Sequence, residues 1–203
     1  MGFKRISLDL AVSLVLFLKR SVLLIFLPYQ TMRQIVKDTS MLEIALILLL
    51  TFFYFWYSSF LKTNSSPFFI SYISFLIFYF LTISYFGFFT FIFTKKLHVR
   101  ALIYTFSYAL VPTLVWFVTT SFFYYFLPPP RTMSFFGTSF SILFLSFSIS
   151  LFIWKIILLF LAIRFATHFT FYKIIYLLVI YGCIFFPACL FFYQIGVFRV
   201  PFV

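Results

Sequence analysis

Apolar residues fill most of this chain in long runs that short polar stretches separate. Five of the runs are long enough to cross a hydrocarbon core of about 30 Å, which takes about 20 helical residues. The predicted spans cover residues 41–61, 68–94, 101–127, 137–163 and 172–195. This pattern predicts an all-α integral membrane protein, in which residues 41–203 form a domain of five transmembrane helices.

Polar and helix-breaking residues mark the ends of the runs. Ser40-Met41-Leu42-Glu43 has the Ser-x-x-Glu form of a capping box and predicts the start of the first span. Lys95-Lys96 ends the second span, and Pro128-Pro129-Pro130 ends the third, because proline cannot continue a helix. Pro112 and Pro187 fall inside the third and fifth spans, so each is predicted to kink its helix and free a backbone carbonyl.

The first 40 residues have a different pattern. Residues 8–27 are apolar enough for a further span, but Lys19-Arg20 would then lie at its middle. Each such charge costs about 2.5–3.5 kcal/mol at a helix centre. We therefore expect a helix at the membrane interface that Pro28 breaks; re-entry into the membrane is the alternative.

After Pro28 a short amphipathic turn is predicted, and residues 1–40 then form an interfacial segment on the cytosolic face. Its apolar and polar faces consist of Met32, Ile35 and Val36 and of Arg33, Gln34 and Lys37.

Composition excludes a soluble domain. Hydrophobic residues make up 65% of the chain, charged residues only 9%, and the mean hydropathy is +1.18. An aromatic fraction of 27% could indicate stacking platforms for bases, but lipid-facing Phe is the simpler interpretation. The net charge of +12 comes from basic residues scattered among apolar runs, so no nucleic-acid partner is expected.

The basic residues segregate by loop, which predicts topology. The positive-inside rule places the N-terminus in the cytosol and the C-terminus outside. The inner side would carry Lys4, Arg5, Lys19, Arg20, Arg33, Lys37, Lys95, Lys96, Arg100, Arg164 and Lys173, and the outer side Lys62, Arg131 and Arg199. The inner residues from Lys19 onward are candidates for binding anionic lipid headgroups or a partner protein, although topology determination alone also explains them.

Lys155 is the ionisable residue that lies clearly within a predicted span. An intramembrane charge is a functional-site hypothesis by default. Snorkelling toward the headgroups and structural pairing are the alternatives, and Glu43 is the expected carboxylate partner. In the same span, small residues at four-residue spacing would allow close helix packing. They are Gly137 with Ser141 and Ser146 with Ser150.

Groups for catalysis or metal binding are scarce. The acidic residues are Asp9, Asp38 and Glu43. Neither histidine, His98 or His168, has acids or cysteines at metal-ligand spacing. Cys183 and Cys189 would point to different faces of a helix. We therefore expect neither an enzyme nor a bound metal or cofactor.

Two short motifs resemble a known family. Pro28 to Val36 reads Pro-x-x-Thr-Met-Arg-x-Ile-Val, with Thr31 and Arg33 at motif positions. Ser107 to Pro112 resembles a Gly-Tyr-x-x-x-Pro stretch, with Tyr108 and Pro112 in place. Both are similar to prokaryotic members of the YIP family, named for interaction with Ypt/Rab GTPases. The Asp-Leu-Tyr-Gly-Pro-Leu-Trp motif of eukaryotic members is absent.

The resemblance implies five spans with a cytosolic N-terminus. It favours a bacterial or archaeal cytoplasmic membrane, with the ER or Golgi membrane as the alternative. We expect a non-catalytic accessory or scaffold subunit that binds another integral membrane protein, such as an ABC-type exporter or a trafficking assembly. The alternatives are a small transporter or channel subunit with a path near Lys155, and a lipid-binding or membrane-shaping protein.

Overall fold

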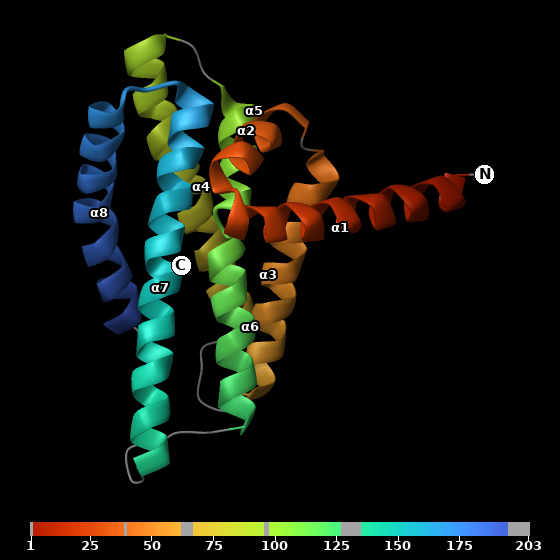
Figure 1. Cartoon of the computed structure of the whole chain (residues 1–203), viewed down its shortest axis with the longest axis vertical. Helices are drawn as coiled ribbons and strands as arrows, with labels where there is room; N and C mark the ends of the chain where they lie inside the picture. Colours follow the sequence, from red (N-terminus) through yellow and green to blue (C-terminus); the bar gives the residue numbers. More distant parts are fainter. Residues whose placement is uncertain (1, 39, 62–66, 96–97, 127–134, 195–203) are drawn as a thin grey trace.

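The computed structural model describes residues 2–38, 40–61, 67–95, 98–126 and 135–194 (Figure 1). Lys62, Lys96, Arg131, Arg199 and the run of three prolines lie outside this part of the chain. The elements in it are all helices: α1 (Gly2–Phe26), α2 (Pro28–Asp38), α3 (Met41–Leu61), α4 (Phe68–Thr94), α5 (Val99–Tyr108), α6 (Val111–Phe126), α7 (Phe135–Thr167) and α8 (Phe171–Gln194).

Within the described residues, five helical segments are long and apolar enough to span a membrane. They are α3, α4, α5 continued by α6, α7 and α8, which confirms the five predicted spans. The third span is interrupted rather than merely kinked, because α5 ends at Tyr108 and α6 begins at Val111. Pro112 then lies in the first turn of α6, where a missing N–H is tolerated. Pro187 lies inside α8, which continues through it.

The third span occupies the middle of the bundle. Helix α5 packs against α2, α3, α4 and α7, and its residues Leu102, Phe106 and Tyr108 are buried. Helix α8 packs against α7 at the edge of the bundle (Figure 1). Several buried hydroxyls donate within their own helices: Thr90 and Thr105, for example, each donate to the carbonyl four residues earlier.

Helix α1 runs across the long helices of the bundle instead of along them, and its N-terminal half projects beyond them (Figure 1). Its buried positions follow one stripe along the helix: Ser13, Phe17, Arg20 and Leu24. The break predicted at Pro28 is confirmed, since α1 ends at Phe26 and Pro28 begins α2. On α2, Met32 and Ile35 are buried whereas Arg33 and Lys37 are exposed.

Two helices end on residues in the left-handed backbone conformation. Lys95 has φ 54° and His168 has φ 57°. Their backbone N–H groups donate to the carbonyls of Phe91 and Arg164, respectively, and so close the last turns of α4 and α7. A side chain in this conformation costs about 1–2 kcal/mol relative to glycine, because Cβ crowds the following carbonyl.

Helix α2 and the turns that join α4 to α5 and α7 to α8 lie at the same end of the bundle (Figure 1). Exposed basic residues gather there: Arg33, Lys37, Lys95, Arg100, Arg164 and Lys173. Two of them also lie over aromatic rings. The Arg164 guanidinium is 5.9 Å from the centre of the Tyr29 ring, and the Lys173 ammonium is 5.4 Å from that of Phe93.

Candidate functional site

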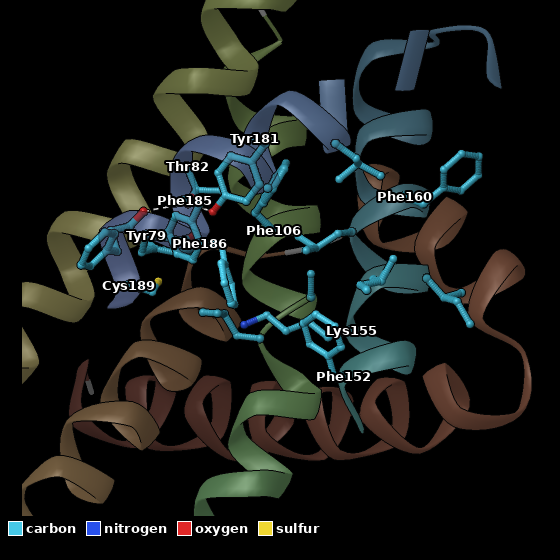
Figure 2. Close-up of a pocket in the computed structure, with 18 of the residues that line it drawn as sticks. Tyr79, Thr82, Phe106, Phe152, Lys155, Phe160, Tyr181, Phe185, Phe186 and Cys189 are labelled. Carbon is cyan, nitrogen blue, oxygen red and sulfur yellow. Dashed lines mark hydrogen bonds between the residues drawn. The ribbon is translucent and has the colours of Figure 1, made fainter. Parts of the chain in front are cut away.

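A cavity of about 590 Å³ lies among α4, α5, α7 and α8 (Figure 2). Its volume falls within the roughly 300–1,000 Å³ of small-molecule sites. Phenylalanine and aliphatic side chains make up most of its lining. Of the lining residues, Ile156 on α7 and Val179 on α8 are also exposed at the surface of the bundle, so the cavity opens onto that apolar surface.

Lys155 extends from α7 into this cavity (Figure 2). It is the charged residue among the described residues that line it. Cys189 of α8 lies across the cavity from α7 (Figure 2). The Lys155 side chain therefore points between the helices.

The hydroxyl groups of the lining are engaged with one another. Thr82 donates to the carbonyl one turn earlier in α4 at 2.8 Å, so Tyr181, 2.8 Å away, donates to Thr82. In the same way Ser107 donates to a carbonyl of α5 at 2.7 Å, and Tyr79 donates to Ser107 at 2.6 Å. Both tyrosine protons are thus used within the protein, so neither hydroxyl has a proton left to donate to a ligand.

Gly182 of α8 also lines the cavity. A Cβ built at this position meets no atom within 4 Å. Gly182 is exposed as well as part of the lining, so a bulky side chain there meets open space at the edge of the cavity and can obstruct it without displacing the backbone.

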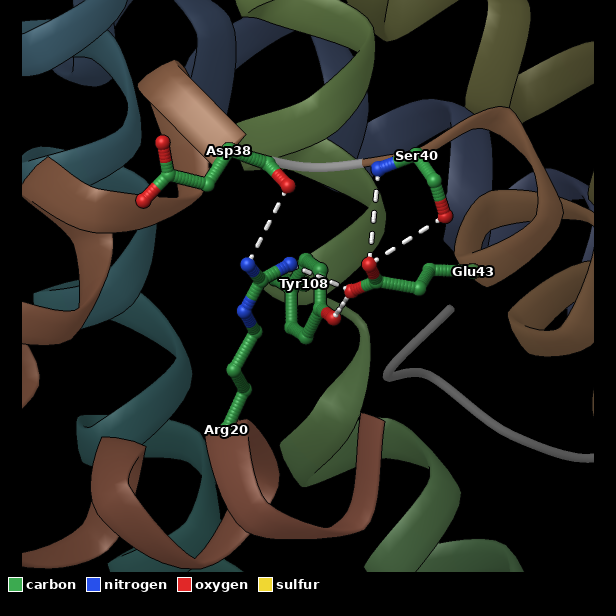
Figure 3. Close-up of polar contacts among 5 residues, drawn as sticks. All are labelled: Arg20, Asp38, Ser40, Glu43 and Tyr108. Atoms are coloured by element: carbon green, nitrogen blue, oxygen red, sulfur yellow. Dashed lines mark hydrogen bonds and ion pairs between the residues drawn. The ribbon is translucent and has the colours of Figure 1, made fainter. Parts of the chain in front are cut away.

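A second polar cluster lies where α1, α3 and α5 meet (Figure 3). The Glu43 carboxylate is fully buried and accepts from Arg20 Nη1 at 2.5 Å and from the Tyr108 hydroxyl. The Ser40 backbone N–H donates to its other oxygen at 3.4 Å, as a capping box predicts, and the Ser40 hydroxyl donates to the same oxygen at 3.2 Å. Arg20 Nη2 also donates to the Asp38 carbonyl at 3.2 Å.

This cluster corrects two predictions. The ion-pair partner of Glu43 is Arg20 and not Lys155, because α1 crosses the bundle and carries Arg20 to the start of α3. Arg20 is 9% exposed, so it is not the lipid- or partner-facing residue that its place beside Lys19 indicated; Lys19 itself is exposed. Burial lowers the pKa of Arg20, but the Tyr108 hydroxyl and the Glu43 charge outweigh it, so the pKa is raised overall.

Sequence reasoning missed Tyr108 as the third member of the cluster. It was singled out only as a residue that resembles the YIP motif. The other motif residues lie nearby in the fold: Pro28 begins α2, and Thr31 donates to the Leu27 carbonyl at 2.8 Å. Of the motif residues, Tyr108 thus joins α5 to α3, and Pro28 and Thr31 lie where α1 meets α2, whereas Arg33 is exposed and Pro112 lies on α6.

The predicted packing stripe of α7 is used in part. Gly137 is buried and Ser141 is half-buried, but Ser146 and Ser150 are exposed on the surface of the bundle. Ser148 is buried instead, and its hydroxyl accepts from the indole N–H of Trp116 on α6 at 3.2 Å. Ser146 and Ser150 therefore do not lie in a helix–helix interface of this chain, and their hydroxyls donate to carbonyls of α7 itself.

No group of three His, Cys, Asp or Glu side chains within the described ranges could hold a metal ion. Comparison with protein-family models, with curated proteins and with solved structures finds no match. The class is therefore defined by the fold: an all-helical chain whose five long apolar segments are those of a multi-pass membrane protein. The resemblance to the YIP family stays a prediction.

Proposed function

We propose that this chain is a non-catalytic, multi-pass membrane protein that binds a lipid-like ligand in the cavity around Lys155. The observation that carries the proposal is a cavity of about 590 Å³ that opens onto an apolar surface and has a predominantly apolar lining. A ligand that reaches such a site travels through the bilayer, because the surface around its opening faces hydrocarbon.

The apolar lining cannot by itself draw a lipid out of the bilayer, since lipid tails are as apolar as the protein wall. Shape and close contact have to supply the affinity, through many small dispersion contacts. Aromatic walls suit this, and Phe106 and Phe185 lie on the cavity (Figure 2). The lining holds neither a carboxylate nor a histidine in the described residues, which supports binding over catalysis.

The cytosolic side, in this proposal, is the end of the bundle where α2 and the exposed basic residues lie. The basic residues there would contact anionic headgroups of the inner leaflet. Helix α1 would lie in the membrane interface, which its many exposed apolar side chains support. In this proposal the N-terminus lies in the cytosol, and the resemblance to prokaryotic YIP members favours a bacterial or archaeal cytoplasmic membrane.

The test is photolabelling in proteoliposomes with hexadecyl probes that carry a diazirine in the chain and end in a carboxylate or an alcohol. Saturable labelling by either probe at residues of α4, α7 and α8 on the cavity is expected. Gly182→Phe puts a bulky ring at the cavity and should abolish the saturable labelling. Ala45→Phe, which adds the same ring at an exposed position of α3, should not. Labelling that ignores Gly182→Phe would refute the binding site.

The second candidate is the accessory or scaffold subunit of a membrane complex, such as an ABC-type exporter or a trafficking assembly. It is favoured by Ser146 and Ser150, which form a small-residue face of α7 that is exposed in the monomer. Purification in mild detergent should then recover a membrane protein at fixed stoichiometry, and Ser146→Leu/Ser150→Leu should release it. An unchanged complex would exclude this face as the interface.

A further inference from the structure

Among the described residues, the largely apolar lining of the cavity carries one charge, and that charge is positive. Lys155 reaches into it from α7, and the remaining polar side chains of the lining are hydroxyls and a thiol. A charge within a membrane span is costly, and the cost is met where the charge faces a cavity, a partner or a ligand. Lys155 therefore distinguishes this cavity from a void that any hydrocarbon would fill equally well.

The hydrogen-bond donors of the lining point to the same conclusion. The protons of Tyr79 and Tyr181 are donated to Ser107 and Thr82, so these tyrosines offer a ligand only acceptor oxygens. An ammonium has three N–H donors, so Lys155 can bind a ligand while it keeps contacts within the protein. A ligand headgroup that needs donors consequently meets them at Lys155.

The charge of the site selects among anionic headgroups. One ammonium balances one negative charge, which a carboxylate or a phosphodiester carries. The phosphodiesters of membrane lipids usually bear two acyl chains, which fit a cavity of about 590 Å³ less well than one chain does. A phosphate monoester carries up to two charges and three acceptor oxygens, and proteins bind it with several donors or with arginine clusters. The described lining offers no arginine and no second lysine.

We propose that the cavity selects single-chain amphiphiles that end in a carboxylate, which is the chemistry of a long-chain fatty acid. The carboxylate binds the Lys155 ammonium, and the hydrocarbon chain lies against the phenylalanine-rich wall that includes Phe106 and Phe185. This inference rests on the proposed ligand-binding function and names the class of ligand.

The experiment titrates the two diazirine probes, which differ only in the carboxylate or alcohol headgroup, over the same range of mole fractions in proteoliposomes of neutral lipid. A charge-assisted hydrogen bond contributes enough for the acid to half-saturate labelling at a concentration about tenfold or more below the alcohol. In Lys155→Met, which removes the charge at similar length, the ratio should fall to about one. Lys155→Arg, which keeps the charge, should retain a preference for the acid.

Each other result overturns a defined part of the reasoning. Equal labelling by acid and alcohol in the wild type refutes the carboxylate preference and leaves the cavity as a ligand site. A preference that survives Lys155→Met refutes the role of Lys155. The absence of saturable labelling by either probe refutes the proposed function and this inference together. The wild-type comparison needs no variant, so the outcome does not depend on how Lys155→Met folds.

Discussion

Removing either member of the Arg20–Glu43 pair should strongly destabilise the fold. Glu43→Leu leaves a guanidinium whose side chain is 11% exposed without its counterion, and it removes the acceptor of Tyr108. Arg20→Met leaves a carboxylate whose side chain is only 1% exposed. Breaking a buried ion pair from one side costs about 3–5 kcal/mol, and we expect both single variants in that range.

The double variant Arg20→Met/Glu43→Leu should be far less destabilised than the sum of the two. It buries no unpaired charge, and replacing a whole buried pair by apolar side chains is often close to neutral. With single effects of about 3–5 kcal/mol each and a double variant that costs at most about 3 kcal/mol, a double-mutant cycle should yield a coupling energy of at least about 3 kcal/mol, at or above the upper end for residues in direct contact.

Equilibrium unfolding in mixed micelles, followed by circular dichroism during titration with sodium dodecyl sulfate, gives the four free energies. Lys19→Met is the matched control, because Lys19 is the exposed neighbour of Arg20 on α1, and its effect should stay within about 0.5 kcal/mol. Simple additivity of the two single effects would refute the structural role assigned to the pair, and so would a Lys19→Met effect as large as that of Arg20→Met.

Three further predictions use the same unfolding assay. Tyr108→Phe removes a hydrogen bond to a charged acceptor and should cost about 1.5–3 kcal/mol; an effect near zero would show that Glu43 does not need this donor. His168→Gly relieves a left-handed backbone at the end of α7 and should stabilise by about 1 kcal/mol, whereas destabilisation would contradict the strain. Phe117→Ala removes a buried ring that stacks on Tyr54 with centroids 3.8 Å apart, so it should cost about 3–5 kcal/mol. The control Phe122→Ala removes an exposed ring and should cost much less; equal losses would refute this account of the core.

The sequence alone determined where the spanning helices lie. The boundaries of α3 and α4 coincide with the predicted spans at residues 41–61 and 68–94. Backbone groups in hydrocarbon have to be satisfied within the segment, so an uninterrupted apolar run of this length has a helix as its solution. Two helix starts could also be predicted from the sequence, because the Ser40–Glu43 cap and Pro28 favour a helix start through local interactions with residues next to them in the chain.

The interruption between Tyr108 and Val111 was only half visible. Pro112 predicts an irregularity in the helix of the third span, because proline has no N–H to donate to the backbone. Whether the helix bends or stops depends on the neighbours that hold Tyr108, whose hydroxyl is bound to Glu43 from another helix.

Charge pairing and the direction of Lys155 were decided by the tertiary structure. Spacing along the chain gave Lys155 and Arg20 no distinct relation to Glu43, and the pairing follows from the path of α1 across the bundle. The cavity likewise forms from two pairs of helices, α4 with α5 and α7 with α8, that are distant from each other in sequence. Coulomb energy and packing depend on distances in space, and in this protein the crossing of α1 and the spacing of α8 from its neighbours set those distances.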